Sequence, residues 1–460
     1  MKKFFIASKE FKQTLYIALI LAFSLSSLSY KQIDSIKSSV KMNNKVDQVK
    51  VTNILKESKG KRILIFAPHP DDEIIAVGGL ISEAIKSGFT VKVVFITNGD
   101  GFGNLMIAEH SRKIKIKSVN EAIALGYERQ IEAIQAAKVL GLTSKNMIFL
   151  GYPDRGISHL WFSNWSKAYT SVHTFKSYSP YNNSYTQKVP YKGESLSKDI
   201  RSIIDSFKPD LVFTPSYFDM HSDHWGTSCF VISELATLEE MNKNWVKDIK
   251  IYFYLVHYGK INWPKERGYK PSRKILPPSE LQRTTIKWLS YPLSKDAVQI
   301  KLAAISEYKS QVVLIGGFLK AFVRTNELFE ELSSLDTAFI IDPETHLVRE
   351  EFIKIGGIKP LEINFANKGL ELPKLFRFLL IGYEANLVLF IKDKNEIVEK
   401  RTKLYLNRLN SQINKDKIVI NFTDKNYKNL YAVYLNMESY FILPLFPLQR
   451  SNWVFVGTNL

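Results

Sequence analysis

Hydrophobic and polar positions alternate along residues 60–260 in a way that is typical of a mixed α/β domain. Short apolar runs, of the kind that form buried strands, are separated by longer stretches with helical spacing. Strands are expected at 63–66, 91–97, 147–150, 211–214 and 251–256. Helices are expected at 74–86, 127–140 and 225–241. Because the two signals alternate, we predict an α/β fold with a Rossmann-like, doubly wound and mostly parallel sheet.

The pattern changes at about residue 343, where short apolar runs begin to alternate with turns rich in Lys, Asn and Asp. This spacing predicts a C-terminal all-β, sandwich-like accessory domain at 343–460. The α/β domain is expected at 60–342, after a polar linker at 30–59. An aromatic-rich insertion at about 155–195 interrupts it. Its rings could stack on sugars or pack the loop onto its own domain, and the sequence leaves both readings open.

The start of the chain has the composition of a secretory signal. Four lysines within the first 12 residues precede an apolar segment at 15–28, and small residues follow. We therefore predict a signal peptide at 1–29, and an extracytoplasmic protein, secreted or in the cell envelope. A membrane anchor at 14–29 is the alternative, although a full span usually needs about 20 apolar residues.

The formal charge of the chain is +18, from 63 Lys and Arg against 45 Asp and Glu. A basic surface can attract nucleic acid, anionic lipid or anionic wall polymers. No arginine-rich stripe or nucleic-acid-binding motif accompanies the charge, so we expect no nucleic-acid partner. Cys229 is the only cysteine, so an intrachain disulfide is excluded. We expect Cys229 to be a small buried apolar side chain.

Candidate chemistry lies where the first predicted strand ends. His69, Asp71 and Asp72 follow the apolar run at 63–66 directly. Pro70 cannot continue a central strand, so the chain should leave the sheet there. In open α/β sheets this carboxyl edge is where ligands bind. Buried charges are costly unless they are paired, solvated or bound to metal, so a divalent cation would explain the cluster.

A second cluster follows another predicted strand. His221, Asp223 and His224 come soon after the apolar run at 211–214. Two parallel strands would thus deliver histidine and aspartate to the same edge of the sheet. Two imidazoles and one carboxylate with an open position make up a usual catalytic zinc site, and they also suit Fe²⁺.

Together the two clusters resemble the PIG-L/LmbE-like family of zinc-dependent N-acetylglucosamine de-N-acetylases. The resemblance covers about residues 60–315. It includes weaker matches in the same order: Thr97–Gly101, Arg129 with Glu132, Gly151–Asp154, and Tyr308–Gln311. Asp100 stands where the turn of the family usually has Glu, which shortens any contact there by one methylene.

The resemblance implies a metal site made by His69, Asp72 and His224. It also implies that Asp71 is the general base that takes a proton from water. Asp71 could be only a cap for the following helix, because Asp is favoured at that position, and the two roles can also coexist. Glu73 is expected to be structural and to bond backbone near the site.

The remaining roles also come from the resemblance. His221 would polarise or protonate the acetamide, and Asp223 would orient His221. Arg129 would contact the substrate, with Asp154 and Asp100 as weaker candidates.

The other histidines have no acidic or histidine neighbours at ligand spacing, and we expect them outside the site: His110, His159, His173, His257 and His346.

The expected function is therefore metal-dependent removal of the N-acetyl group from an N-acetylglucosamine-containing glycan or glycoconjugate outside the cytoplasm. Its partner would be an N-acetylated amino sugar, for which a cell-envelope glycan is a candidate. The alternatives are an amidase acting on another N-acyl conjugate and a non-catalytic glycan-binding envelope protein. The sequence carries no prediction of the oligomeric state.

Overall fold

The structure is a computed structural model that describes residues 49–331 apart from 103–117, 217, 242, 260–262, 265, 279–280 and 282–286. Beyond residue 331 it describes the strands from Phe339 onward. The predicted signal segment at 1–29, most of the predicted linker, and the residues His110 and His346 lie outside the described residues.

The centre of the α/β part is a mixed sheet of eight strands in the order β1-β7-β8-β6-β5-β2-β3-β4. The strands are β1 (Lys50–Val51), β2 (Arg62–Ala67), β3 (Thr90–Thr97), β4 (Met147–Tyr152), β5 (Leu211–Pro215), β6 (Lys250–Tyr254), β7 (Trp288–Pro292) and β8 (Asn326–Glu331).

Five neighbouring strands, β6, β5, β2, β3 and β4, pair in parallel. These are the five strands that the apolar runs predicted. The structure adds β8, which is antiparallel to both of its neighbours, and β7 with β1 beyond it. The prediction missed β7 and β8 because their sequences mix polar and apolar residues, including Glu327 and Glu330 on β8.

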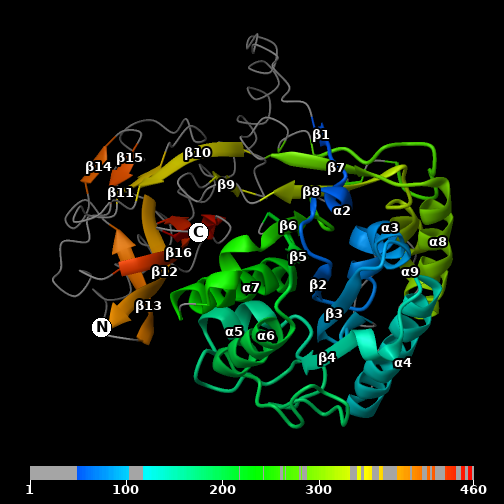
Figure 1. Ribbon diagram of the computed structural model, residues 1–460. Coiled ribbons are helices and arrows are strands. Elements are labelled where there is room, and N and C mark those ends of the chain that lie inside the picture. Colours follow the sequence, from blue (N-terminus) through cyan, green and yellow to red (C-terminus); the bar gives the residue numbers. More distant parts are fainter. Residues whose placement is uncertain are drawn as a thin grey trace, which may run out of the picture. The chain divides into compact units, whose positions relative to one another are not determined.

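Helices cover both faces of this sheet (Figure 1). Alternate residues of β2 point to opposite sides: Ile63 and Ile65 join one apolar core, Leu64 and Phe66 the other. The first core lies under α3 (Asp72–Lys86), α4 (Val119–Val139), α8 (Lys295–Ser306) and α9 (Lys309–Lys320). The second lies under α5 (Ile157–Phe162), α6 (Gly193–Phe207) and α7 (Ser222–Glu240). The short helices are α2 (Ile54–Glu57), η2 (Ser144–Asn146) and η3 (Asn244–Asp248).

The two ends of α4 show how the local sequence determines where a helix begins and ends. α4 begins at Val119, eight residues before the predicted start, because the Ser118 side chain caps it by accepting from the backbone of Glu121 at 3.2 Å. The helix ends as predicted before Gly141, whose φ of +89° suits a residue without a side chain. Gly79 in α3 allows close packing, since a Cβ there would lie 2.6 Å from Leu293.

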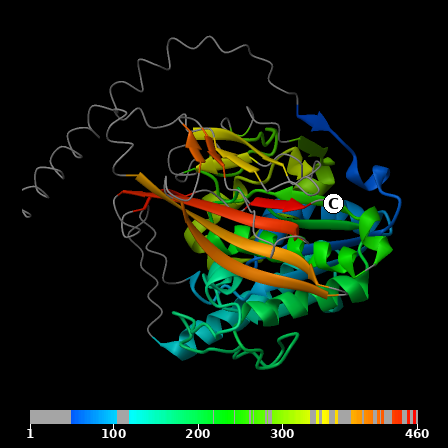
Figure 2. The same ribbon diagram turned by 90° about the vertical axis from the view of Figure 1, so that its left-hand side faces the viewer.

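The C-terminal part of the chain is described as strands that pair antiparallel with their neighbours. They are β9 (Phe339–Asp342), β10 (Leu347–Lys354), β11 (Glu362–Phe365), β12 (Ile381–Asp393), β13 (Glu396–Leu406), β14 (Gln412–Asn414), β15 (Lys417–Val419), β16 (Leu430–Phe441), β17 (Pro447–Arg450) and β18 (Val454–Gly457). The long ribbons of β13, β12 and β16 run side by side, in orange to red (Figure 2). A sandwich-like domain made of these strands stays a prediction. No helix in the described part of the chain has the length and apolar character needed to cross a bilayer.

Candidate active site

The loop that carries the first cluster is tightly held between β2 and α3. The carbonyl of Pro68 accepts from both the backbone and the side chain of Thr97, each at 2.9 Å. Glu73 accepts from the backbone of Asp71 at 3.1 Å and from the hydroxyl of Tyr308. This confirms the structural role expected for Glu73. The bonds fix the backbone at the point where the chain leaves the sheet and α3 begins.

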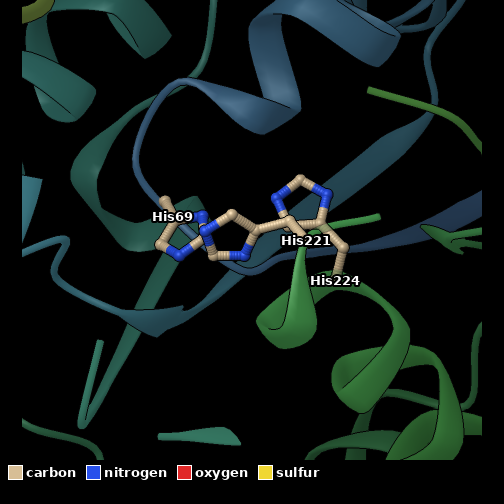
Figure 3. A group of neighbouring side chains, drawn as sticks. All are labelled: His69, His221 and His224. Carbon is tan, nitrogen blue, oxygen red and sulfur yellow. The ribbon is translucent and has the colours of Figure 1, made fainter. Parts of the chain in front are cut away.

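Three side chains from two distant segments converge at this edge of the sheet. Asp72 Oδ2 lies 3.1 Å from His69 Nδ1 and 3.2 Å from His224 Nε2. The three side chains are buried. Figure 3 shows His224 with His221 at the start of α7, and His69 beside them; one ring nitrogen of each imidazole lies within 4.8 Å of the others.

A carboxylate holds the opposite nitrogen of each imidazole. His69 Nε2 lies 3.1 Å from Asp223 Oδ2 and 3.5 Å from Asp154 Oδ1. His224 Nδ1 lies 3.1 Å from Asp219 Oδ2. Such contacts orient metal-binding imidazoles and decide which nitrogen faces the metal. Here these contacts leave Nδ1 of His69 and Nε2 of His224 facing the carboxylate of Asp72.

The donor set fits a divalent cation. His224 Nε2 is buried, and although Asp72 Oδ2 lies 3.2 Å away, the two atoms do not form a well-aligned hydrogen bond. Burial alone would lower the pKa of His224, but Asp219 and Asp72 raise it to about 10, so the surroundings are strongly anionic. A bound cation would satisfy the nitrogen and take the place of a proton there. Two imidazoles and one carboxylate suit Zn²⁺ or Fe²⁺.

Asp71 lies beside this set in a strained backbone conformation, with φ of 125°. Its carboxylate is buried and lies 3.3 Å from Nη2 of Arg129. Burial raises the pKa of Asp71 to about 7, against the lowering effect of the Arg129 guanidinium. A carboxylate with a pKa near neutrality is suited to general-base work. Asp71 does occupy the N-cap position of α3, as the alternative expected, but its side chain makes no capping hydrogen bond there.

His221 and Asp223 are both present at the site, but their predicted relation is wrong. His221 Nδ1 accepts from the backbone of Asp223 at 3.3 Å, which leaves Nε2 to carry the ring proton. The carboxylate of Asp223 contacts His69 instead, and it accepts from the backbones of Arg155 at 2.6 Å and Ile157 at 3.1 Å. Residues two apart on a helix do not face each other, so Asp223 orients His69 and the start of α5.

Arg129 does not have the substrate-facing position that we predicted. Its side chain is buried, with Nη1 donating to the carbonyl of Gly99 at 3.0 Å. Nη2 donates to the carbonyl of Pro70 at 2.5 Å and to Asp71 at 3.3 Å. Because these bonds use both terminal nitrogens, Arg129 joins the loops after β2 and β3 and positions Asp71.

Asp100 and Asp154 also differ from the predicted sugar contacts. Asp100 is fully buried and accepts from the hydroxyl of Tyr181 at 2.8 Å, which ties the aromatic insertion to the turn after β3. Asp154 accepts from the backbone of Gly101 at 2.9 Å and lies behind His69. Asp100 has no exposed surface, and the carboxylate of Asp154 is occupied by Gly101 and His69.

Two histidines that the sequence placed outside the site lie at it. The ring of His257, just after β6, has its centroid 4.8 Å from that of His224. His173, in the insertion, packs against Gly101, where a Cβ would lie 2.3 Å from its Nε2. The signal available for His257 was its place directly after a strand parallel to β5. His173 had no such signal. His159 is exposed.

The aromatic insertion is mainly packed onto its own domain. Trp161, Tyr181 and Tyr191 are almost completely buried. Phe175, Tyr178 and Tyr185 are exposed by 70%, 43% and 46%, so their rings can meet a sugar. The packing role is therefore shown for part of the insertion, and the sugar-stacking role stays a prediction for the exposed rings.

Several solved structures are similar to this chain at low identity. The N,N'-diacetylchitobiose deacetylase of Pyrococcus horikoshii is 20% identical, with 62% of this chain and 87% of that chain covered and a TM-score of 0.36. A deacetylase of the teicoplanin biosynthesis pathway is 17% identical, with 59% and 97% covered and a TM-score of 0.37. A conserved protein of Thermus thermophilus is 19% identical, with 56% and 84% covered and a TM-score of 0.31.

The sequence is also similar to a curated protein and to a family model. A glucosamine-6-phosphate deaminase-like protein of Bacteroides thetaiotaomicron is 24% identical over 207 residues. The alignment covers 42% of this chain and only 30% of that relative. Residues 64–234 match the model of the family described as PIG-L, GlcNAc-PI de-N-acetylase. The matched range contains both clusters and ends before His257.

Proposed function

We propose that the chain is a metal-dependent hydrolase acting on N-acetyl groups, because residues 64–234 match the model of the GlcNAc-PI de-N-acetylase (PIG-L) family. Its substrate would be an N-acetylglucosamine-containing glycan or glycoconjugate. The observation that carries the proposal is the convergence of His69 and His224 on Asp72, with Asp71 beside them. A cation site next to a buried carboxylate of near-neutral pKa is suited to amide hydrolysis by an activated water.

In this reaction His69, Asp72 and His224 would hold the cation. When bound, the cation supplies Lewis acidity to water and to the acetamide oxygen. Asp71 accepts the proton of the attacking water. The hydrogen bond from Arg129 keeps the Asp71 carboxylate in place. The hydrogen bond from the Asp71 backbone N–H to Glu73 stabilises the strained backbone conformation of Asp71.

The water oxygen adds to the carbonyl carbon, the C–N bond then breaks, and Asp71 returns the proton to the departing nitrogen. The products are acetate and a free amine. The Nε2–H of His221 can donate to the carbonyl oxygen as negative charge develops there, because Nδ1 already accepts from the backbone. The ring of His221 lies close to the cation site, with its centroid 4.8 Å from that of His69.

The proposal is tested by measuring acetate release and metal content on the same preparation. N-acetylglucosaminyl compounds, including chitooligosaccharides, peptidoglycan fragments and inositol-linked sugars, should release acetate. Asp71→Asn should lower the rate by roughly 10²–10⁴, as for loss of a general base, while keeping the fold and the bound metal. Asn tolerates the positive φ at this position. Asp248→Asn, which changes an exposed aspartate on η3, is the matched control.

Three outcomes would count against the proposal. Release of acetate by Asp71→Asn at the wild-type rate would show that Asp71 is not the general base. A metal-loaded protein that releases nothing from any substrate would favour a glycan-binding role. Hydrolysis confined to N-acyl compounds without a sugar would assign the site to a different amidase. Metal analysis of the purified protein would decide between Zn²⁺ and Fe²⁺.

We also propose that the enzyme works outside the cytoplasm, with residues 343–460 as a β-rich accessory domain. Support comes from the lysine-rich start and the apolar segment at 15–28. If the full chain is expressed in a bacterial host, it should be recovered from the envelope or medium. N-terminal sequencing would separate a cleaved signal from a retained anchor, and recovery from the cytoplasm alone would contradict the location.

A further inference from the structure

Four imidazole rings meet at this edge of the sheet and form two triangles that share one side. The shared side joins His221 and His224, whose ring centroids are 5.1 Å apart. His69 completes one triangle at 4.8 and 5.3 Å from these rings. His257 completes the other at 5.3 and 4.8 Å. His257 therefore lies as close to the shared pair as His69 does.

His257 also belongs to a group with the composition of a metal site. One ligand atom each from Asp72, His224 and His257 lie within 4.8 Å of one another. This is again one carboxylate with two imidazoles, the same donor chemistry as the set completed by His69. Asp72 and His224 belong to both sets, with Asp72 Oδ2 3.2 Å from His224 Nε2.

The protein holds His257 in place on several sides. Its backbone N–H donates to Asp219 at 3.0 Å, and its carbonyl accepts from the backbone of Met220 at 2.9 Å. Its ring stacks on Phe318 of α9, with centroids 5.5 Å apart and an angle of 17° between the planes. The same Asp219 oxygen contacts His224 Nδ1. A ligand fixed in this way loses little freedom when it binds an ion.

We propose that His257 is an additional ligand of the cation held by Asp72 and His224. The inference rests on the metal set of the proposed function but not on the reaction, because it concerns binding of the ion alone. It extends the site beyond the residues that match the family model, since His257 follows the end of that match at residue 234.

The test uses the full chain after removal of metal, titrated with Co²⁺ and followed by its visible absorption. His257→Gln should bind Co²⁺ at least about tenfold more weakly, the lower end of losses seen when a group supporting a metal is removed, and should show altered absorption bands. His159→Gln is the matched control, because His159 is exposed and lies outside the site. Equal affinity and an unchanged spectrum in His257→Gln would overturn the proposal.

His257→Cys tests for a direct bond. A thiolate bound to Co²⁺ gives an intense near-ultraviolet charge-transfer band, and soft thiolates bind such ions well. The one native cysteine, Cys229, lies on α7 and is buried in the second core, so the wild type supplies the baseline. The band should appear in His257→Cys. Cobalt bound by this variant without the band would show that His257 only shapes the site, which would also overturn the proposal. Acetate release is not measured here, so failure of the reaction and failure of this inference are separate results.

Discussion

A buried ion pair between Lys301 and Glu327 supports the helix on which the site is built. Lys301 Nζ lies 2.7 Å from Glu327 Oε1, and both side chains are 1% exposed. The same carboxylate accepts from the backbones of Gly79 at 2.7 Å and Leu80 at 2.9 Å. The pair thus links α8 and β8 to α3, whose first residue is Asp72.

We expect Lys301→Met to destabilise the protein by about 3 kcal/mol. Removing one partner of a buried pair costs roughly 3–5 kcal/mol, because the other charge is left buried and unpaired. Burial already raises the pKa of Glu327, so the carboxyl can take up a proton when the ammonium is lost. This neutralisation places the expected cost at the lower end. Methionine keeps the apolar stem that packs near Gly78.

The assay is urea or thermal unfolding of the variant beside the wild type. A loss of about 3 kcal/mol corresponds to a fall in Tm of about 6 °C for a domain of this size. Lys295→Met is the matched control, because Lys295 is exposed on the same helix. The double variant Lys301→Met with Glu327→Gln should lose less free energy of unfolding than the sum of the losses in the two single variants. A cost below about 1 kcal/mol for Lys301→Met, or strict additivity in the double variant, would refute this account of the pair.

Two further predictions concern positioning and pH. Arg129→Lys should lower kcat about tenfold or more with little change in KM, because Arg129 acts by holding Asp71; a raised KM with unchanged kcat would instead indicate a substrate contact. Burial raises the pKa of Glu330 to about 8 from an ordinary 4.5. The protonated carboxyl therefore contributes its full stability to the fold below pH 4.5, the pKa in the unfolded chain. This contribution is lost as the pH rises towards about 8. Glu330→Gln should therefore become progressively more stable than the wild type across this window, as measured by urea unfolding at several pH values, and a pH-independent difference would contradict it.

The parallel part of the sheet could be predicted from the sequence because its strands are buried on both faces. A strand covered on both sides is a continuous apolar run, as in Ile63–Phe66. The strands beyond β6, which are β8 and β7, do not follow this rule. β8 carries Glu327 and Glu330, both buried, and their burial depends on partners that are distant in the sequence. The polar residues of β8 therefore hide the strand from any analysis of periodicity.

The metal-binding candidates were predictable for a different reason. His69 and His224 each follow a recognisable strand and stand beside acids in the sequence. His257 follows a strand as well, but no acid or histidine accompanies it locally. Its neighbours at the site, Asp72 and His224, come from two other segments. Only the order of the strands, with β6 beside β5, brings them together.

The carboxylates behind the imidazoles show where sequence reasoning stops. Asp223 was expected to serve His221, two residues away, yet its carboxylate serves His69, 154 residues away. Asp219 supports His224 and the backbone of His257 at once. These contacts decide which nitrogen of each ring faces the ion, and hence whether the set can bind it at all. Since they depend on the path of the loops and not on local spacing, the metal-binding residues can be predicted from motifs, while the groups that orient them must be found in the fold.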